Sequence, residues 1–169
     1  LVFVSSGAEA NNLAIKGMVL AGRNKSKKHV IVSAIEHHSV LNSARFLERF
    51  LDFEVTFLPV DGYGLVDPKR LESVISPETV LVSIMHSNNE IGTIQPIEEI
   101  ARITREKNVV FHVDAVDSVG VVPVDVQKLG VDLLSFASNP MYGPAGVGGL
   151  YVRRGTHIWP LLDGGVQEN

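Results

Sequence analysis

The 169-residue sequence contains no cysteine, which excludes disulfide bonds, thiolate metal sites and a cysteine nucleophile within these residues. No apolar run approaches the roughly 20 residues of a membrane-spanning helix, and no signal-peptide pattern opens the chain. Runs of one charge are scarce too, since the basic cluster KSKKH at residues 25–29 is short. We therefore expect a cytoplasmic protein that binds neither membranes nor nucleic acid.

The composition of the chain is that of one folded domain. Apolar residues make up 45% and charged residues 20% of the sequence, and the net charge is −4. These values are ordinary for a globular protein and argue against disorder. The length suffices for one domain with a sizeable core. The chain opens with an apolar run at Leu1 and closes in a loop-like stretch at residues 163–169, so we interpret it as the interior of a longer protein.

Apolar, β-branched runs alternate with segments of helical periodicity along the sequence. Strands are predicted over residues 1–4, 29–34, 53–60, 79–85, 109–113, 131–136 and 149–152. Helices are predicted from about residue 9 to residue 22 and over residues 40–51, 67–75 and 97–107. This alternation predicts an α/β fold with a mostly parallel seven-stranded sheet and helices on both faces.

Polar and glycine-rich residues follow several of the predicted strands. In parallel sheets, ligands bind beyond the carboxyl ends of the strands. Those ends are residues 5–8, 36–38, 86–90, 114–117 and 137–140. One strand leads directly into Asp114, and another is followed by the glycine-rich residues 143–149. A carboxylate and a glycine-rich turn at neighbouring strand ends predict a site for a small, partly anionic ligand.

Five ordered segments resemble the cysteine desulfurases: SGAEANNLAIKG, SAIEHHSVLNSARFLE, HSNNEIGTIQPIEEIA, HVDAVDSVG and YGPAGVGGLYVRRG. These NifS-like members of the class V aminotransferase superfamily are pyridoxal phosphate enzymes of fold type I. The resemblance implies that residues 1–169 form the central part of the cofactor-binding large domain, with an N-terminal segment and a C-terminal small domain outside this chain. It implies a homodimer that takes sulfur from L-cysteine, giving alanine and a persulfide for iron–sulfur cluster or thio-cofactor assembly.

Several residues match family positions that bind pyridoxal 5′-phosphate. Asp114 matches the carboxylate that keeps the pyridine nitrogen protonated, so that the cofactor can act as an electron sink. His37 matches the catalytic histidine that stacks on the cofactor, and Asn89 matches the residue near the phenolic oxygen. The backbone N–H groups of Gly7 and Ala8 are expected to hold the phosphate. On the residues alone, Asp114 could instead cap a turn, His37 could be a loop residue, and Asn89 a turn asparagine.

Other positions of the expected site depart from the family pattern. Where that pattern reads Ser-x-His-Lys, this chain has Ala137, Asn139 and Pro140. Pro140 occupies the Schiff-base lysine position, and its nitrogen is already part of the backbone. Asp117 replaces a glutamine that faces the phenolic oxygen. The phosphate-binding threonine expected after Ala8 is missing, either because Glu9 replaces it or because the sequence slips by one residue there. All these changes weaken cofactor binding, so the cofactor is expected to bind noncovalently if it binds.

Two functions remain open on this reading. The first is an active, cysteine desulfurase-like enzyme, whose nucleophilic cysteine would lie beyond residue 169. The second is a catalytically degenerate homologue that acts as a dimeric scaffold, binding an iron–sulfur scaffold protein or another sulfur acceptor. A metal site formed by the histidines at positions 37, 38, 86 and 112 is not expected, because their spacing is not that of metal ligands.

Overall fold

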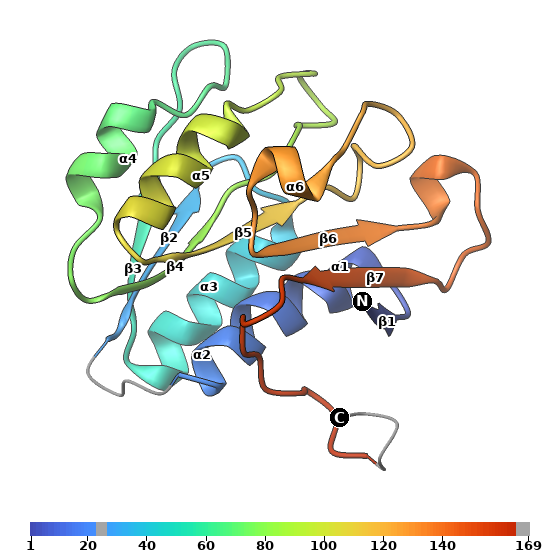
Figure 1. Cartoon of the computed structure of the whole chain (residues 1–169), viewed down its shortest axis with the longest axis horizontal. Coiled ribbons are helices and arrows are strands. Elements are labelled where there is room, and N and C mark those ends of the chain that lie inside the picture. Colours follow the sequence, from blue (N-terminus) through green and yellow to red (C-terminus); the bar gives the residue numbers. More distant parts are fainter. Residues whose placement is uncertain (23–26, 165–169) are drawn as a thin grey trace.

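The seven predicted strands form a single sheet in a computed structural model that describes residues 1–22 and 27–164. The strands are β1 (Val2–Val4), β2 (His29–Ser33), β3 (Glu54–Leu58), β4 (Thr79–Ser83), β5 (Val110–Asp114), β6 (Leu133–Ala137) and β7 (Gly148–Val152). Their order is β1-β7-β6-β5-β4-β2-β3. Strands β2 to β6 pair in parallel, whereas β7 runs antiparallel to both β6 and β1. The predicted mostly parallel α/β sheet is confirmed (Figure 1).

Helices cover both faces of this sheet, as predicted (Figure 1). On one face lie α3 (His38–Leu51) and a helical segment made of α1 (Gly7–Asn12), the π-helical η1 (Leu13–Gly17) and α2 (Met18–Leu20). On the other face lie α4 (Pro68–Val74), α5 (Ile97–Glu106) and the short α6 (Val126–Leu129). A 3₁₀ turn, η2 (Asn139–Met141), follows β6. None of the helices in the described part of the chain has the length and apolarity needed to cross a membrane.

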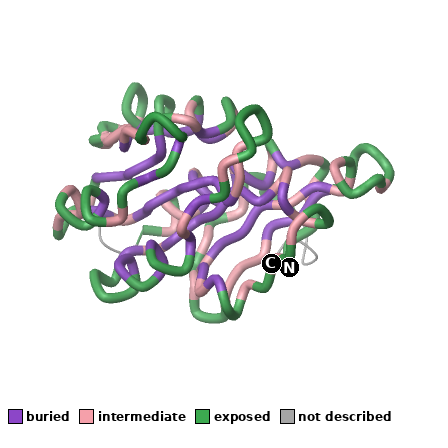
Figure 2. The backbone as a smooth tube through the Cα atoms, turned by 90° about the horizontal axis from the view of Figure 1, so that it is seen from above, coloured by how far each residue is buried: buried purple, intermediate pink, exposed green. Residues whose placement is uncertain are grey.

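The apolar core consists of two layers separated by the sheet. In β2, Val30 and Val32 pack toward α3 and η1, whereas Ile31 packs toward α4 and α5. Successive side chains of a strand point to opposite faces, so a strand buried on both faces is apolar along its length. Figure 2 shows the buried strands running through the interior, with exposed residues on the outer turns and loops. This burial makes the central strands a rigid support for the loops at their ends.

Several predicted boundaries were wrong by one to three residues. β4 ends at Ser83 instead of residue 85, because the Met85 N–H donates to the Glu36 carboxylate instead of a neighbouring strand. β5 is shifted to Val110–Asp114, which places Asp114 on the last position of the strand. The first helix was predicted to continue to about residue 22, but its last turn ends at Leu20, and its centre is π-helical. The difference at β4 comes from a contact between residues 49 positions apart, which adjacent residues in the sequence do not reveal.

Candidate active site

Asp114 lies buried at the carboxyl end of β5, against α1. Its Oδ1 atom accepts a hydrogen bond from the Val116 N–H at 3.0 Å, and its Oδ2 atom accepts one from Asn11 Nδ2 at 2.7 Å. Burial and the charge of Asp117 raise the pKa of Asp114, whereas these two hydrogen bonds and the charge of His37 lower it. A carboxylate can accept about four hydrogen bonds, so Asp114 retains capacity for a further, cationic donor.

His37 is the N-cap of α3, and its ring is exposed at the same edge of the sheet. Its Nδ1 atom accepts the Ser39 N–H at 3.1 Å and lies 2.7 Å from Ser39 Oγ. The Ser39 hydroxyl in turn lies 2.9 Å from Asn11 Nδ2, which also bonds Asp114. The structure therefore brings the predicted pair, Asp114 and His37, into one hydrogen-bond network.

Asn11 and Ser39 complete this network, and neither residue was predicted to have a role. Asn11 is buried on the inner side of the first helical segment, which also carries Ala10 in α1 and Ala14 in η1. A polar side chain on the apolar face of an amphipathic helix is the signal that could have singled it out, because a buried amide needs hydrogen-bond partners. Ser39 offered no comparable signal.

The start of α1 carries the predicted phosphate-binding backbone. Gly7 is buried so tightly that an added Cβ would lie 2.4 Å from Val116 Cγ2. Helix-initial N–H groups, such as those of Gly7 and Ala8, lack a carbonyl partner within the helix. The Glu9 carboxylate turns back to Ser5, at 2.8 Å from its N–H and 2.5 Å from its hydroxyl, and these bonds lower the pKa of Glu9. Glu9 thus places a negative charge in the first turn of α1.

The end of β6 carries the positions that depart from the family pattern. Ala137 is buried and pairs with Gly148, Asn139 is exposed, and Pro140 lies in η2. The Ser138 hydroxyl donates to the carbonyls of Pro144 and Val147, so it closes its own loop. Ser138 therefore does not replace the hydroxyl that is missing at Ala137.

Glu36 is a buried carboxyl group beside the predicted site, at the end of β2. Its Oε1 atom accepts hydrogen bonds from Ser33 Oγ at 2.5 Å and from the Met85 N–H at 2.7 Å, whereas its buried Oε2 atom has no partner. Burial, together with the charge of Asp114, raises the pKa of Glu36 to about 8, although these two hydrogen bonds lower it. Glu36 therefore joins the ends of β2 and β4 as a neutral acid near pH 7.

Asn89 and Asp117 lie outside the hydrogen-bond network. Asn89 is exposed, and within the described residues its side chain has no hydrogen bond. The turn is held instead by Asn88, whose Oδ1 accepts the N–H groups of Glu90 at 2.9 Å and Ile91 at 3.1 Å. Asp117 is half-buried and acts on Asp114 through its charge. The roles of both residues toward a cofactor stay predictions.

The histidines at positions 86 and 112 are structural. His112 is fully buried between Ser83 Oγ at 2.8 Å and Ser135 Oγ at 2.9 Å, so it links β4, β5 and β6. Burial lowers the pKa of His112 to about 3, which keeps the ring neutral. His86 bonds Ser118 at 3.0 Å. Across residues 1–22 and 27–164, no group of three His, Cys, Asp or Glu side chains could hold a metal ion.

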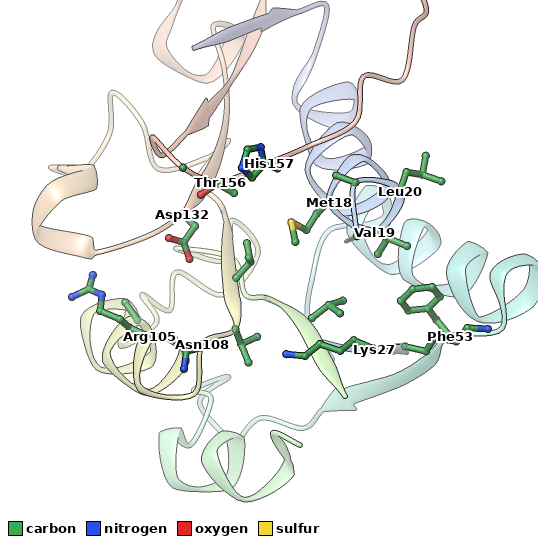
Figure 3. Close-up of a pocket in the computed structure, with 18 of the residues that line it drawn as sticks. Met18, Val19, Leu20, Lys27, Phe53, Arg105, Asn108, Asp132, Thr156 and His157 are labelled. Carbon is green, nitrogen blue, oxygen red and sulfur yellow. The ribbon is translucent and has the colours of Figure 1, made fainter. Parts of the chain in front are cut away.

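A cavity of about 800 Å³ lies at the opposite edge of the sheet (Figure 3). Its walls include Val80 and Val110 near the starts of β4 and β5, together with Met18, Phe53 and Arg105. Ligands of open α/β sheets bind at the carboxyl ends of the strands, where Asp114 and His37 lie, and not at this amino edge. The cavity is therefore separate from the candidate active site.

Comparison with known proteins identifies the family. The family model for aminotransferase class-V matches residues 1–168. The chain belongs to this family. It is 54% identical over 169 residues to the cysteine desulfurase IscS of Dictyoglomus turgidum, and 53% identical over 168 residues to that of Methanosarcina thermophila. All or nearly all of the chain is aligned, but it spans only 42% and 41% of the lengths of these relatives.

Solved structures of class V relatives have the same fold. A NifS-like protein matches 98% of this chain and 46% of its own, with a TM-score of 0.93 and 42% identity. The structure described as SspA in complex with cysteine matches 99% of this chain and 48% of its own, with a TM-score of 0.93 and 43% identity. These matches confirm the predicted fold of the pyridoxal phosphate-dependent large domain.

The class V family implies pyridoxal phosphate, and the residues present fit this cofactor only in part. Buried Asp114 retains acceptor capacity for a pyridinium N–H, and the helix start at Gly7 offers backbone donors for a phosphate. The Oδ1 atom of Asn11 is buried without a partner next to that carboxylate. Pro140, however, has no amine with which to bind the cofactor covalently. The donor set therefore suits reversible binding and excludes attachment at Pro140.

Proposed function

We propose that the full-length protein is a cysteine desulfurase-like enzyme with reversibly bound pyridoxal phosphate. It would remove sulfur from L-cysteine, leaving alanine, and pass the sulfur on as a persulfide for iron–sulfur cluster or thio-cofactor assembly. The single observation that carries this proposal is the network that joins Asp114 and His37 at the carboxyl edge of the sheet. The identity of 54% to a cysteine desulfurase IscS supports the same chemistry.

The residues at this edge have distinct roles in the proposal. Bound pyridoxal phosphate supplies an electron sink for bond breaking next to the substrate nitrogen. Asp114 holds a proton on the pyridine nitrogen through its acceptor capacity, in a site dry enough to strengthen that ion pair. The N–H groups of Gly7 and Ala8 bind the phosphate. Exposed His37 orients the substrate through its Nε2 atom, since Nδ1 is occupied by Ser39.

Pro140 makes the proposed binding weaker than covalent attachment. Its nitrogen is a backbone amide, so the cofactor is held by contacts alone and exchanges with the solution. The negative charge of Glu9 opposes the phosphate at the helix start, and the charge of Asp117 opposes the phenolic oxygen. We therefore expect a low cofactor affinity.

The second candidate function is a scaffold without catalysis. The observation that favours it is the loss of reactive groups at Ala137, Asn139 and Pro140, while the surrounding sheet is intact. In this case the protein would be a homodimeric platform for a sulfur acceptor or an iron–sulfur scaffold protein. The assignment of residues 1–169 to the central part of the large domain, the homodimer and a cytoplasmic location stay predictions under both functions.

The test is a titration of the full-length protein and its Pro140→Lys variant with pyridoxal phosphate, followed by absorption. Saturable binding to the natural protein supports the enzyme, provided that L-cysteine added with a thiol reductant gives alanine and sulfide, since the reductant releases the persulfide sulfur as sulfide. A second outcome is binding and turnover only in Pro140→Lys, whose mass rises by that of the cofactor after reduction with borohydride. This result supports loss of catalysis at position 140. Absence of binding in both proteins supports the scaffold.

A neighbouring substitution provides the matched control for this experiment. Met141 follows Pro140 in η2 and is exposed, so Met141→Lys introduces an amine into the same turn. If the geometry of the site directs attachment, borohydride fixes the cofactor to Pro140→Lys and not to Met141→Lys. Equal labelling of both variants would show nonspecific reaction of exposed lysines.

A further inference from the structure

The amide of Asn11 bridges the two sides of the candidate site. Its Nδ2 atom carries two protons, one directed to Asp114 Oδ2 at 2.7 Å and the other to Ser39 Oγ at 2.9 Å. The reverse orientation of the amide would place Oδ1 against the Asp114 carboxylate, where two acceptors repel each other. The observed orientation leaves Oδ1 buried without a partner. Asp114 therefore determines how Asn11 is oriented.

The orientation of Asn11 sets the direction of the next hydrogen bonds. Ser39 Oγ accepts a hydrogen bond from Asn11 Nδ2. The hydroxyl hydrogen of Ser39 can therefore be donated to His37 Nδ1, 2.7 Å away. The Ser39 N–H donates to the same Nδ1 atom at 3.1 Å. A ring nitrogen that accepts two hydrogen bonds carries no proton, so the proton of the neutral ring lies on Nε2.

We propose that Asn11 and Ser39 are positioning residues, which hold His37 as its Nε2–H tautomer and tie its ring to the Asp114 carboxylate. The tautomer itself is independent of any cofactor, but its use in catalysis rests on the proposed function. In this arrangement Nε2–H is a fixed hydrogen-bond donor toward the substrate side. Protonation of Nδ1 requires the Ser39 hydroxyl to turn and the bond from the Ser39 N–H to break.

The charged groups around this network do not replace Asn11 and Ser39. The His38 ring lies 6.2 Å from the His37 ring between centroids, tilted by 54°. The charge of Asp117 acts on Asp114, and the charge of Asp114 acts on Glu36. None of His38, Asp117 and Glu36 has a hydrogen bond to His37 within the described residues. The tautomer therefore depends on the two bonds from Ser39 and on the support of its hydroxyl by Asn11.

The test is long-range ¹H–¹⁵N NMR of the histidine rings in the full-length protein without added cofactor. The His37 signals are assigned by their loss in His37→Gln. We expect His37 Nδ1 to resonate as an unprotonated nitrogen in the natural protein. In Asn11→Ala and Ser39→Ala, it should move toward the average of the two tautomers.

Neighbouring residues provide matched controls for both substitutions. Asn12 follows Asn11, but its Nδ2 atom bonds the Ala8 carbonyl, and Ser43 lies one turn beyond Ser39 and bonds the Ser39 carbonyl. Asn12→Ala and Ser43→Ala should leave the His37 signals unchanged. If Asn11→Ala does not fold, Ser39→Ala alone decides, because it removes one oxygen atom from a half-buried residue.

A second measurement separates this proposal from the proposed function. Asn11→Ala removes a hydrogen bond to a charged group, so we expect its dissociation constant for pyridoxal phosphate to rise about 10-fold. A His37 tautomer that changes in both variants supports the positioning role, whether or not the natural protein binds the cofactor. If the natural protein binds no cofactor, only the proposal of an enzyme fails. A tautomer that is unchanged in the folded variants overturns the positioning role, whatever the cofactor does.

Discussion

Replacement of Glu36 by glutamine is expected to change how the stability of the protein depends on pH. Glu36 is 5% exposed, and its pKa is raised from 4.5 to about 8. Between these two pH values the native protein holds a proton that the unfolded chain releases. The stability linked to Glu36 is therefore fully present below pH 4.5 and is lost as the pH rises to about 8.

The structure sets the size of this effect. Each pH unit between the two pKa values costs about 1.4 kcal/mol, so the loss reaches about 5 kcal/mol by pH 8. Glutamine keeps the acceptor for Ser33 and the Met85 N–H, but does not titrate. The side-chain NH2 group of the new glutamine would lie at the position of Oε2, which has no partner. Unpaired buried donors lower the free energy of unfolding by about 1–3 kcal/mol at every pH. Glu36→Gln should thus be less stable at pH 5 and about 2–4 kcal/mol more stable at pH 8.

The assay is urea unfolding of the full-length protein and the variant at pH 5, 6.5 and 8, followed by circular dichroism. The two curves of unfolding free energy against pH should cross. Glu48 is exposed on the same helix that follows Glu36, so Glu48→Gln serves as the control and should give the same small offset at every pH. Parallel curves for Glu36→Gln and the natural protein would refute the assignment of a retained proton to Glu36.

Two further substitutions test packing at the strand ends. Gly7→Ala should destabilise the protein by about 1–3 kcal/mol in urea unfolding, because the new methyl group would lie 2.4 Å from Val116 Cγ2. Val116→Ala in the same chain should recover most of this loss, and equal losses with and without Val116→Ala would contradict the contact. His112→Phe should cost about 2–4 kcal/mol at pH 7, because the buried hydroxyls of Ser83 and Ser135 lose their partner. Since burial lowers the pKa of His112 to about 3, its neutral ring loses stability as the pH falls below 6.5, and the penalty for His112→Phe should shrink there. A penalty that is constant from pH 7 to pH 5 would contradict the buried neutral ring.

The sequence alone was sufficient to predict the α/β class, the seven strands and the edge of the sheet at which the candidate site lies. Strands such as β2 are apolar along their length because both of their faces are buried, and this pattern is local. The carboxyl-edge rule then placed Asp114 and His37 at the same end of the sheet. The absence of an amine at Pro140 was equally plain, because it follows from the chemistry of one residue.

Only the tertiary structure decided which polar groups meet at that edge. Asn11 and Asp114 are 103 positions apart, and Glu36 and Met85 are 49 apart, so no local pattern links them. Their contacts depend on the pairing order that places β4 between β2 and β5, and on the packing of α1 against β6 and β7. The raised pKa of Glu36 and the bridge through Asn11 arise from burial at this junction, and burial is a property of the packed molecule and not of the chain.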